Sequence, residues 1–291
     1  MTRRFLGRRS GVVLTLLTLV AALALTGLTS PVQARTSAGK VPQDAAFQIA
    51  TFNILGSQHT LGPGGYGPGA LRAAITSRLI ERKGLDLVGM QEVQADQLEV
   101  LRTDLDGFDI WPGDRLGPSG LRLQIAWRTS KFELLETGTI TTTFDHQMRP
   151  IPWVRLLNRK SQRQLYVVDV HNSPRGQEHD RDKATRHEIR LVDELRATHK
   201  AVFLIGDMNE HDEVFCSVVG RTDLVAANGG TATSADDCQP PTGWLHIDWI
   251  FGGGPLTFSD YGWEDGASVR AASDHDLVHA TVTLPARGDG A

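Results

Sequence analysis

Several apolar segments of the chain each lead to a side chain that can bind a cation, accept a proton or hydrogen-bond a phosphate. In LIGDMNE, for example, a short apolar strand runs directly into Asp207 and Asn209. Ionised carboxylates at the ends of buried strands repel one another and are costly to desolvate, unless a cation or a base lies among them. Taken singly, each such residue could close a turn, cap a helix or fill the core, so the prediction rests on the set. The set comprises Asn53, Glu92, His171, Asn172, Asp207, Asn209, Asp248, Asp274 and His275.

The residue types in this set favour one kind of chemistry. Oxygen ligands from Glu, Asp and Asn suit a hard cation such as magnesium, manganese or calcium. Zinc would favour His and Cys at short spacings, and the sequence has no such cluster. Two histidines, His171 and His275, indicate proton transfer near neutral pH, and an Asp that accepts from an imidazole would orient it. The combination predicts metal-assisted hydrolysis of a phosphoester.

The elements that must position these residues are read from the apolar pattern. Two helices are predicted, over 70–84 and 179–200, and the charges of the second are interpreted as a solvated face. Their apolar stripes are Leu71, Ala74, Ile75 and Leu79 in the first, and Leu191, Val192 and Leu195 in the second. Strands are predicted over 47–54, 85–93, 121–128, 151–159, 165–171, 201–207, 246–251 and 277–284. Many strands with few helices, and proline-containing segments read as edge strands, predict two packed sheets flanked by helices rather than a doubly wound parallel sheet.

The N-terminus has the pattern of an export signal. Residues 1–34 combine four arginines, an apolar stretch over 12–29 and small residues at Val32 and Ala34. We therefore expect a signal peptide over 1–34, a flexible lead-in over 35–46 and a secreted, extracellular protein. A retained membrane anchor is the alternative, although the apolar stretch is short for a membrane span.

Charge and cysteine content set further limits. The formal net charge is −4, and loss of residues 1–34 would make it more negative. An acidic surface argues against strong nonspecific binding of nucleic acid, but a nuclease that recruits divalent cations stays possible. An exported chain with only two cysteines is expected to pair them, so we predict a Cys216–Cys238 disulfide, with two free buried thiols as the alternative.

Six short segments give the chain a family resemblance. ATFNIL, MQEV, VVDVHNSP, LIGDMNE, HIDWIF and SDHDLV follow one another along nearly the whole chain. In this order they resemble the endonuclease/exonuclease/phosphatase superfamily. The resemblance implies one domain over 47–286, an α/β fold in which two mixed β-sheets form a four-layer sandwich flanked by helices, and a metal-dependent hydrolase of phosphoester bonds.

The resemblance also implies roles for the matching residues. The principal metal site would comprise Glu92 and Asn53, with Asp274 close by. Asp207 and Asn209 resemble the pair that holds the scissile phosphate and the attacking water, or a second ion. His275 and Asp248 resemble the catalytic histidine–aspartate pair of the family. The divalent cation is expected to be Mg²⁺, with Mn²⁺ or Ca²⁺ as alternatives.

One branch of the superfamily is the closest match. His171 resembles the second catalytic histidine of secreted, pancreatic-type deoxyribonucleases, and Arg149 resembles a phosphate-binding arginine there, with Asn172 as a further substrate-binding candidate. Asp114, in WPGDRLG, is a candidate to orient His171. The cysteines resemble the disulfide of that branch in placement, although Cys238 lies farther from its aspartate than expected.

The substrate stays open at this point. The first hypothesis is a nuclease acting on DNA or RNA; the alternative is a phosphodiesterase or phosphatase acting on lipid head groups, as in sphingomyelinase-like members, or on small phosphate esters. A catalytically idle binding module is a third reading, and the complete site set argues against it. No stable protein partner is implied, and a monomer is expected. Other side chains that could line the site are Arg115, Arg122, Arg155, Arg175, Arg181, His246 and His146, with Trp244 and Trp249 as candidates for an apolar surface.

Overall fold

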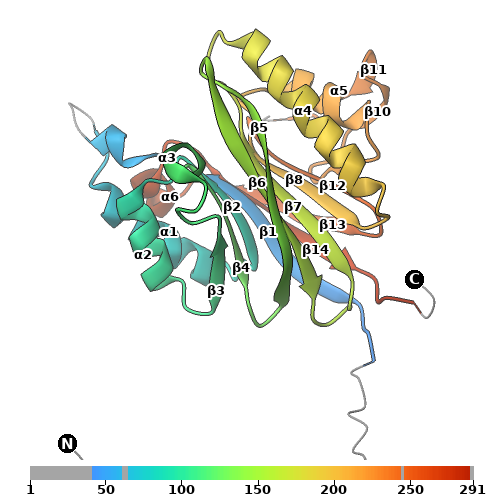
Figure 1. Cartoon of the computed structure of the whole chain (residues 1–291), viewed down its shortest axis with the longest axis horizontal. Helices are drawn as coiled ribbons and strands as arrows, with labels where there is room; N and C mark the ends of the chain where they lie inside the picture. The colour runs from blue at the N-terminus through green and yellow to red at the C-terminus, as the bar shows by residue number, and fades with distance from the viewer. Residues whose placement is uncertain (1–40, 61–64, 244–245, 289–291) are drawn as a thin grey trace, which may run out of the picture. The chain divides into compact units, whose positions relative to one another are not determined.

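A computed structural model describes residues 41–60, 65–243 and 246–288 of the chain. The predicted signal peptide, half of the lead-in (35–40) and Trp244 lie outside the described residues. Within them, no helix is both long and apolar enough to cross a membrane. The described part is arranged as layers, with two β-sheets face to face and helices on their outer faces (Figure 1).

The first sheet has six strands and is mixed. Its strand β1 pairs in parallel with β2, whereas all its other pairs are antiparallel. In spatial order the strands are β13 (Thr257–Glu264), β14 (Leu277–Leu284), β1 (Ala45–Asn53), β2 (Leu87–Gln91), β4 (Leu123–Arg128) and β3 (Phe108–Trp111).

The second sheet also has six strands and a single parallel pair, β7 with β8. Its order is β5 (Phe132–Phe144), β6 (Gln147–Asn158), β7 (Gln164–His171), β8 (Ala201–Asp207), β12 (Asp248–Gly253) and β9 (Val225–Ala226). A separate hairpin is formed by β10 (Thr231–Ser234) and β11 (Asp237–Gln239).

Helices cover the outer faces of both sheets. The first sheet is covered by α1 (Gly69–Arg82), α2 (Ala95–Asp104) and α6 (Ala267–Ala272), and the second by α4 (Glu178–Arg196) and α5 (Asp212–Val219). A one-turn helix α3 (Gly117–Gly120) lies near β6, and a 3₁₀ turn η1 (Ser57–Thr60) follows β1. Two mixed sheets between helical layers confirm the predicted fold class.

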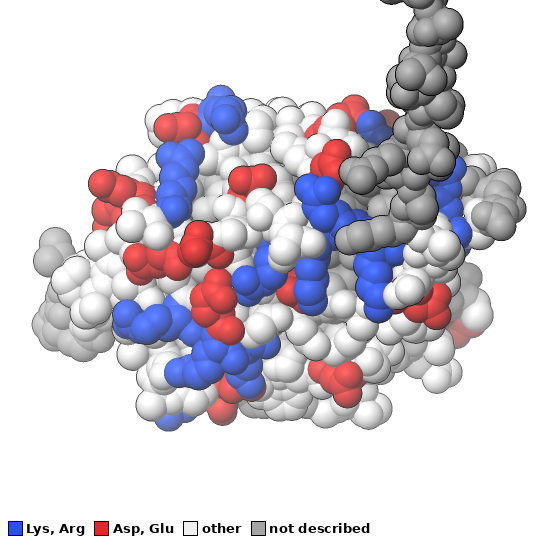
Figure 2. All heavy atoms as spheres, turned by 90° about the horizontal axis from the view of Figure 1, so that it is seen from below, with Lys and Arg blue, Asp and Glu red and all other residues white. Residues whose placement is uncertain are grey.

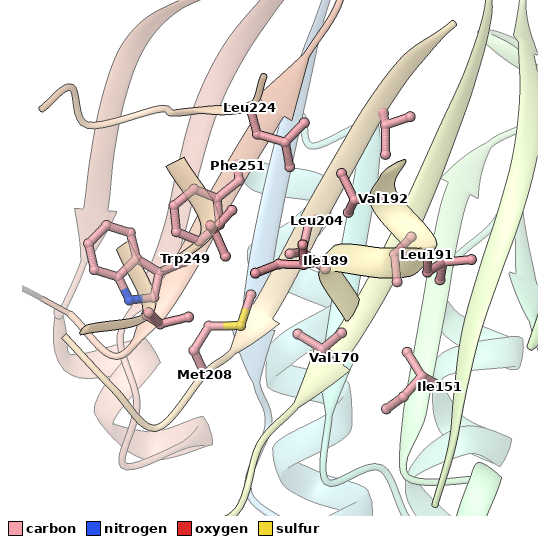
Figure 3. Close-up of a cluster of buried hydrophobic side chains, with 14 of the residues drawn as sticks. Ile151, Val170, Ile189, Leu191, Val192, Leu204, Met208, Leu224, Trp249 and Phe251 are labelled. Carbon is pink, nitrogen blue, oxygen red and sulfur yellow. The ribbon is translucent and has the colours of Figure 1, made fainter. Parts of the chain in front are cut away.

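Three apolar clusters hold the layers together. One lies between the sheets and includes Phe47 and Phe203, and a second joins α1, α2 and α6 to the first sheet. The third packs α4 and α5 on the second sheet, where Leu191 and Val192 of α4 meet Leu204 of β8 (Figure 3). The predicted apolar stripe of the helix over 179–200 is thus confirmed. The predicted disulfide is also present, and it ties α5 to β11 through Cys216 and Cys238.

The proline-containing segment over 151–159 was wrongly predicted as an edge strand. It forms most of β6, which lies between β5 and β7. Proline is tolerated because β7 pairs only with residues 153–157, so Pro150 and Pro152 lie in the part of β6 that pairs with β5 alone. A residue without an N–H is accommodated where a strand has one free side.

The predicted inner face of the first helix was wrong in part: Leu79 is buried and Ile75 packs against the core, but Leu71 is not buried. Leu71 is 54% exposed, whereas Arg72 is fully buried in α1. The Arg72 guanidinium donates to the backbone carbonyl oxygens of Ile54, Leu55, Gly56 and Gly67, and so holds the loop after β1. A sequence pattern that treats arginine as exposed misses this role, because the carbonyls that satisfy a buried guanidinium come from distant residues.

Candidate active site

The fold brings the predicted strand-end residues together. Strands β1 and β2 of one sheet and β7 and β8 of the other end at the same edge of the sandwich. In the register of the second sheet, Asp207 lies beside His171 on β7 and beside Asp248 on β12. His275 precedes β14, next to β1, so residues far apart in the sequence meet in one place.

Asn53 lies at the centre of this group. Its side-chain Nδ2 lies 3.1 Å from Glu92 Oε1, 3.0 Å from Asp207 Oδ2 and 3.4 Å from His275 Nε2. Its Oδ1 accepts a hydrogen bond from the backbone N–H of Leu55 at 3.1 Å. Asn53 therefore presents its amide N–H groups to the acids and links the two sheets, and its role as a metal ligand stays a prediction.

Asp207 lies within ion-pair distance of both histidines. Its buried Oδ2 lies 3.3 Å from His171 Nε2 and 3.6 Å from His275 Nε2, and its Oδ1 accepts from the backbone N–H of Asn209 at 2.9 Å. Burial raises the pKa of Asp207, and the nearby Asp248 raises it further, whereas the two imidazoles oppose the shift. A carboxylate so surrounded is held in one orientation.

His275 and Asp248 form a close pair. His275 Nδ1 lies 2.8 Å from Asp248 Oδ2, which directs Nε2 toward Asp207. Burial favours a lower pKa for His275, but the charge and hydrogen bond of Asp248 and the charge of Asp207 outweigh it and raise the pKa to about 10. The loop is fixed by Ser273, whose Oγ donates to the Asn53 carbonyl and accepts from the His275 backbone N–H.

His171 is the more buried imidazole, and it packs edge-on against Phe144. Burial lowers the pKa of His171, while Asp207 and Glu92 counteract part of the shift. In the described residues its Nδ1 has no hydrogen-bond partner.

The structure does not bring Asp114 to His171. The Asp114 side chain is 76% exposed and lies 3.6 Å from Arg102, so solvent and a surface arginine satisfy its charge. The suggested orienting role is therefore contradicted by the geometry.

Glu92 lies on the first-sheet side of the site. Its Oε2 accepts from the Gly56 backbone N–H at 3.0 Å and lies 3.4 Å from His59 Nε2, a residue that the sequence patterns did not single out. Burial acts to raise the pKa of Glu92, but the charge of His171 and these hydrogen bonds outweigh it and lower the pKa. Glu92 and Asn209 both have left-handed backbones, with φ of 64° and 52°, a conformation that is costly for such residues and common at functional sites.

These residues line an open cleft of about 450 Å³. Its lining includes three arginines, Arg122, Arg149 and Arg175, which we call the arginine wall. The Arg149 guanidinium lies 3.5 Å from the centre of the Phe144 ring, and burial followed by the charge of Arg122 lowers the pKa of Arg149 to about 10. A desolvated, stacked guanidinium is well suited to bind a phosphate.

Four other side chains that the sequence suggested for the cleft lie outside it. Arg115 lies over the Trp111 ring, Arg155 pairs with Glu136, and His146 is exposed beside Asp180. Trp249 packs in the apolar cluster of the second sheet. None of these four side chains lines the cleft.

Asn172 and Arg181 act from beneath the cleft. The fully buried Asn172 side chain donates to Glu188, and its backbone carbonyl accepts from Asn209 Nδ2 at 2.9 Å. The Asn172 side chain thus points away from the cleft and positions Asn209, contrary to the predicted contact with substrate. Arg181 is likewise buried and pairs with Glu210, so the charged face of α4 is not wholly solvated as predicted.

The donor set fits a hard divalent cation. The carboxylates of Glu92, Asp207 and Asp274 line one cleft, and Asp248 Oδ1 is buried without a hydrogen-bond partner among the described residues. Carboxylate oxygens dominate and no cysteine thiol is near, because both cysteines form the disulfide. Such donors suit magnesium, manganese or calcium better than zinc.

The family assignment follows from the sequence. Residues 50–275 match the model of the endonuclease/exonuclease/phosphatase family. The chain belongs to this family and is a metal-dependent hydrolase that acts on phosphoester bonds, as the sequence patterns predicted. No curated protein sequence matches the chain.

Solved structures share the fold at low sequence identity. A Bacteroides thetaiotaomicron family member has a TM-score of 0.65 at 17% identity, covering 84% of this chain and 100% of its own. D. rerio TDP2 in complex with a single-strand DNA product has a TM-score of 0.63 at 20% identity, with coverages of 82% and 99%. A B. thetaiotaomicron mannosyl-6-phosphatase has a TM-score of 0.61 at 16% identity, with coverages of 82% and 99%. At these identities the comparisons establish the fold alone.

Proposed function

We propose that this chain is a secreted, Mg²⁺-dependent nuclease that hydrolyses phosphodiester bonds in DNA or RNA, similar to pancreatic-type deoxyribonucleases. The observation that carries the proposal is the convergence of two imidazoles, His171 and His275, on the single carboxylate of Asp207 inside a cleft with an arginine wall. Two proton-handling groups suit a reaction in which water loses a proton and a leaving oxygen gains one.

Each residue in the cleft has a role in this proposal. Asp248 holds the His275 ring so that Nε2 faces the cleft, where it exchanges a proton with water or with the leaving oxygen. His171 supplies the second imidazole for the other proton transfer. Asp207 orients the nucleophilic water, and Asn209 donates to a phosphoryl oxygen. Arg149, one of the arginines that line the cleft, binds the phosphate.

Glu92 and Asp274 are the residues that would hold Mg²⁺, with Asn53 fixing the Glu92 carboxylate from one side. The bound ion would offset the negative charge that develops on the phosphate and the leaving oxygen.

The charge of the cleft favours a polymeric phosphodiester. Arg122, Arg149 and Arg175 give the cleft three cations, which suits successive phosphates better than a single one. Among proteins of the same fold, TDP2 has been captured with a single-strand DNA product and another member is a mannosyl-6-phosphatase, so the fold alone does not choose the substrate.

The deciding assay uses purified protein without residues 1–34. Nicking of supercoiled plasmid with Mg²⁺, and none with a chelator, is the expected result, and ribosomal RNA tests the second polymer. Cleavage of sphingomyelin or of p-nitrophenyl phosphate without any nicking would instead support the lipid or small-ester alternative. Arg149→Ala should raise KM for plasmid while the Asp114→Asn protein behaves as wild type.

Export is a separate part of the proposal. It rests on the pattern of residues 1–34 and on the Cys216–Cys238 disulfide, since disulfides persist mainly in oxidising compartments. Expression of the full chain in a secreting host should release a protein whose N-terminus, read by mass spectrometry, is Arg35. A full-length protein retained with the cells would contradict export without affecting the hydrolase assignment.

A further inference from the structure

Trp263 is an exposed aromatic side chain at the cleft end of the first sheet. It lies on the edge strand β13, opposite Val278 in register, and β14 begins two residues after His275. Trp263 is 44% exposed, and it is the only aromatic residue among the large apolar side chains exposed in the described part of the chain. An exposed indole needs a functional explanation more than an exposed aliphatic residue does.

A series of side-chain contacts connects Trp263 with the loop that carries His275. Its ring centre lies 4.8 Å from that of His246, and His246 Nδ1 lies 3.4 Å from Asp276 Oδ2, the residue after His275. Tyr261 lies 6.5 Å from Trp263, and burial together with the charge of Asp248 raises the pKa of Tyr261 to about 12. We call His246, Tyr261 and Trp263 the aromatic wall. None of the three lines the cleft, so the prediction that His246 lines it is wrong; His246 instead packs against Trp263, beside the cleft.

The aromatic wall differs in charge from the arginine wall. Asp276 is partly exposed beside His246, and Glu264 follows Trp263 directly, paired with Lys83. These carboxylates would repel a phosphate, whereas Arg122, Arg149 and Arg175 inside the cleft would attract one. The uncharged face of a nucleobase is the part of a nucleotide that suits an indole.

We propose that Trp263 is a stacking platform for a nucleobase of a single-stranded nucleic acid at the point where the strand extends beyond the cleft along β13. The inference rests on the proposed nuclease function and adds where the base lies. Stacking on an aromatic side chain is tolerant of base identity, so it adds affinity for strands without a strict sequence preference. A lipid surface is the less favoured ligand, because a single indole bordered by Asp276 and Glu264 is not a contiguous apolar patch.

The test compares two strands that differ only in their bases. One is a fluorescent single-stranded DNA of roughly eight nucleotides, a length within the range that single-strand sites cover. The other has the same backbone with abasic residues throughout. Binding is followed by anisotropy in a chelator, so that no strand is cleaved. Trp263→Ala should bind the normal strand roughly tenfold more weakly and lose most of the preference for it over the abasic strand. Trp263→Phe, which keeps a ring, should lie between.

Two control variants separate stacking from other effects. Val225→Ala removes an exposed apolar side chain on β9, at the edge of the other sheet from Trp263, and should bind both strands as wild type does. Arg149→Ala should weaken the binding of both strands equally and reduce the salt dependence of that binding. Trp263→Ala should not change the salt dependence, because it removes no phosphate contact. Thermal unfolding verifies that each variant is folded.

The possible outcomes are distinct. An equal loss on both strands, or no loss, would overturn the stacking role while plasmid nicking by the wild type still supports the nuclease. If Trp263→Ala loses binding only to sphingomyelin vesicles, the stacking role is overturned in favour of a lipid contact. If the wild-type protein neither binds nor cuts either strand, the proposed function itself fails, and the stacking role fails with it.

Discussion

The two ends of the sandwich differ in how they place ionisable side chains, which are mostly exposed at one end and buried at the other. At the end away from the cleft, Lys, Arg, Asp and Glu side chains intermix on the surface (Figure 2). The Arg159–Glu133 pair at this end has its atoms 2.9 Å apart, with both side chains about half exposed. At the cleft end, Asp207, Asp248 and the imidazoles of His171 and His275 are largely or wholly removed from solvent.

This difference decides what a substitution should do. Water and salt screen an exposed pair, so such pairs contribute little to stability. A buried group has no such screening, and removal of one partner leaves the others uncompensated. We therefore expect substitutions at the cleft to change activity or pH dependence, and substitutions of the exposed pairs to change very little.

The largest effect is expected for His275→Ala. Loss of a proton-handling imidazole should lower kcat by about 10² to 10⁴. Asp248→Asn should lower kcat for the same reason, because its partner loses orientation, and the double variant should be no worse than His275→Ala alone. Turnover of a fluorescent oligonucleotide at saturating Mg²⁺ measures all three. Additive losses would mean that the two residues act separately.

The next effect concerns pH and the buried Glu188 beneath the cleft. Burial raises the pKa of Glu188 from 4.5 to about 7, and Glu210 adds to the shift while the Asn172 hydrogen bond opposes it. Between these pH values the folded protein holds a proton that the unfolded chain has released. The free energy of unfolding should therefore fall as pH rises from about 4.5 to 7 and stay level above, by up to about 3 kcal/mol from this residue.

Glu188→Gln keeps the shape and removes the titration. Urea unfolding at pH 5 and pH 8 should give a smaller difference between the two values for Glu188→Gln than for the wild type. Glu194→Gln, an exposed change on the same helix, serves as the control and should behave as the wild type. The same pH difference in Glu188→Gln and wild type would mean that Glu188 is not protonated in the folded state.

A smaller effect is expected for Asp86, the buried carboxylate at the end away from the cleft. Its Oδ2 lies 2.6 Å from Lys131 Nζ and accepts from the Gln48 backbone N–H at 3.0 Å. Asp86→Asn should reduce the free energy of unfolding by about 1 to 3 kcal/mol, since hydrogen bonds to a charged group are lost, and leave kcat unchanged. Glu133→Gln on the same end should cost less than about 1 kcal/mol. A fall in kcat for Asp86→Asn would show that this end is coupled to the cleft.

The strand-end residues could be predicted from sequence because each follows an apolar run directly. Asn53, Glu92, His171 and Asp207 are placed by the strands that precede them, and parallel strands end at the same edge. The fold class follows from the same pattern, because amphipathic helices and buried strands must form layers.

The features that the sequence did not predict depend on contacts between segments far apart in the chain. Burial of Arg72 is set by loop carbonyls around residues 54–56 and 67, and burial of Glu188 by Asn172, neither of which a local pattern reveals. Strand β5 was missed because most of its residues are exposed or half-exposed, so it lacks the apolar run that marks a core strand. The aromatic wall likewise requires an edge strand and a loop to meet at residues 263 and 246.

The smallest effect is expected for Asp114, which the sequence suggested as a partner of His171. Its carboxylate is exposed and faces Arg102, while His171 is held by Asp207 and Phe144. Asp114→Asn should therefore leave kcat and its pH profile within twofold of wild type, and should change the free energy of unfolding by less than about 1 kcal/mol. A displaced pH profile in Asp114→Asn would mean that the loop carrying Asp114 closes over His171 during turnover. Asp207 already lies beside Nε2 of His171, so such closure would have to bring the Asp114 carboxylate to the buried Nδ1 of His171. A new carboxylate contact there would change the protonation of His171, so the pH profile is the sensitive readout.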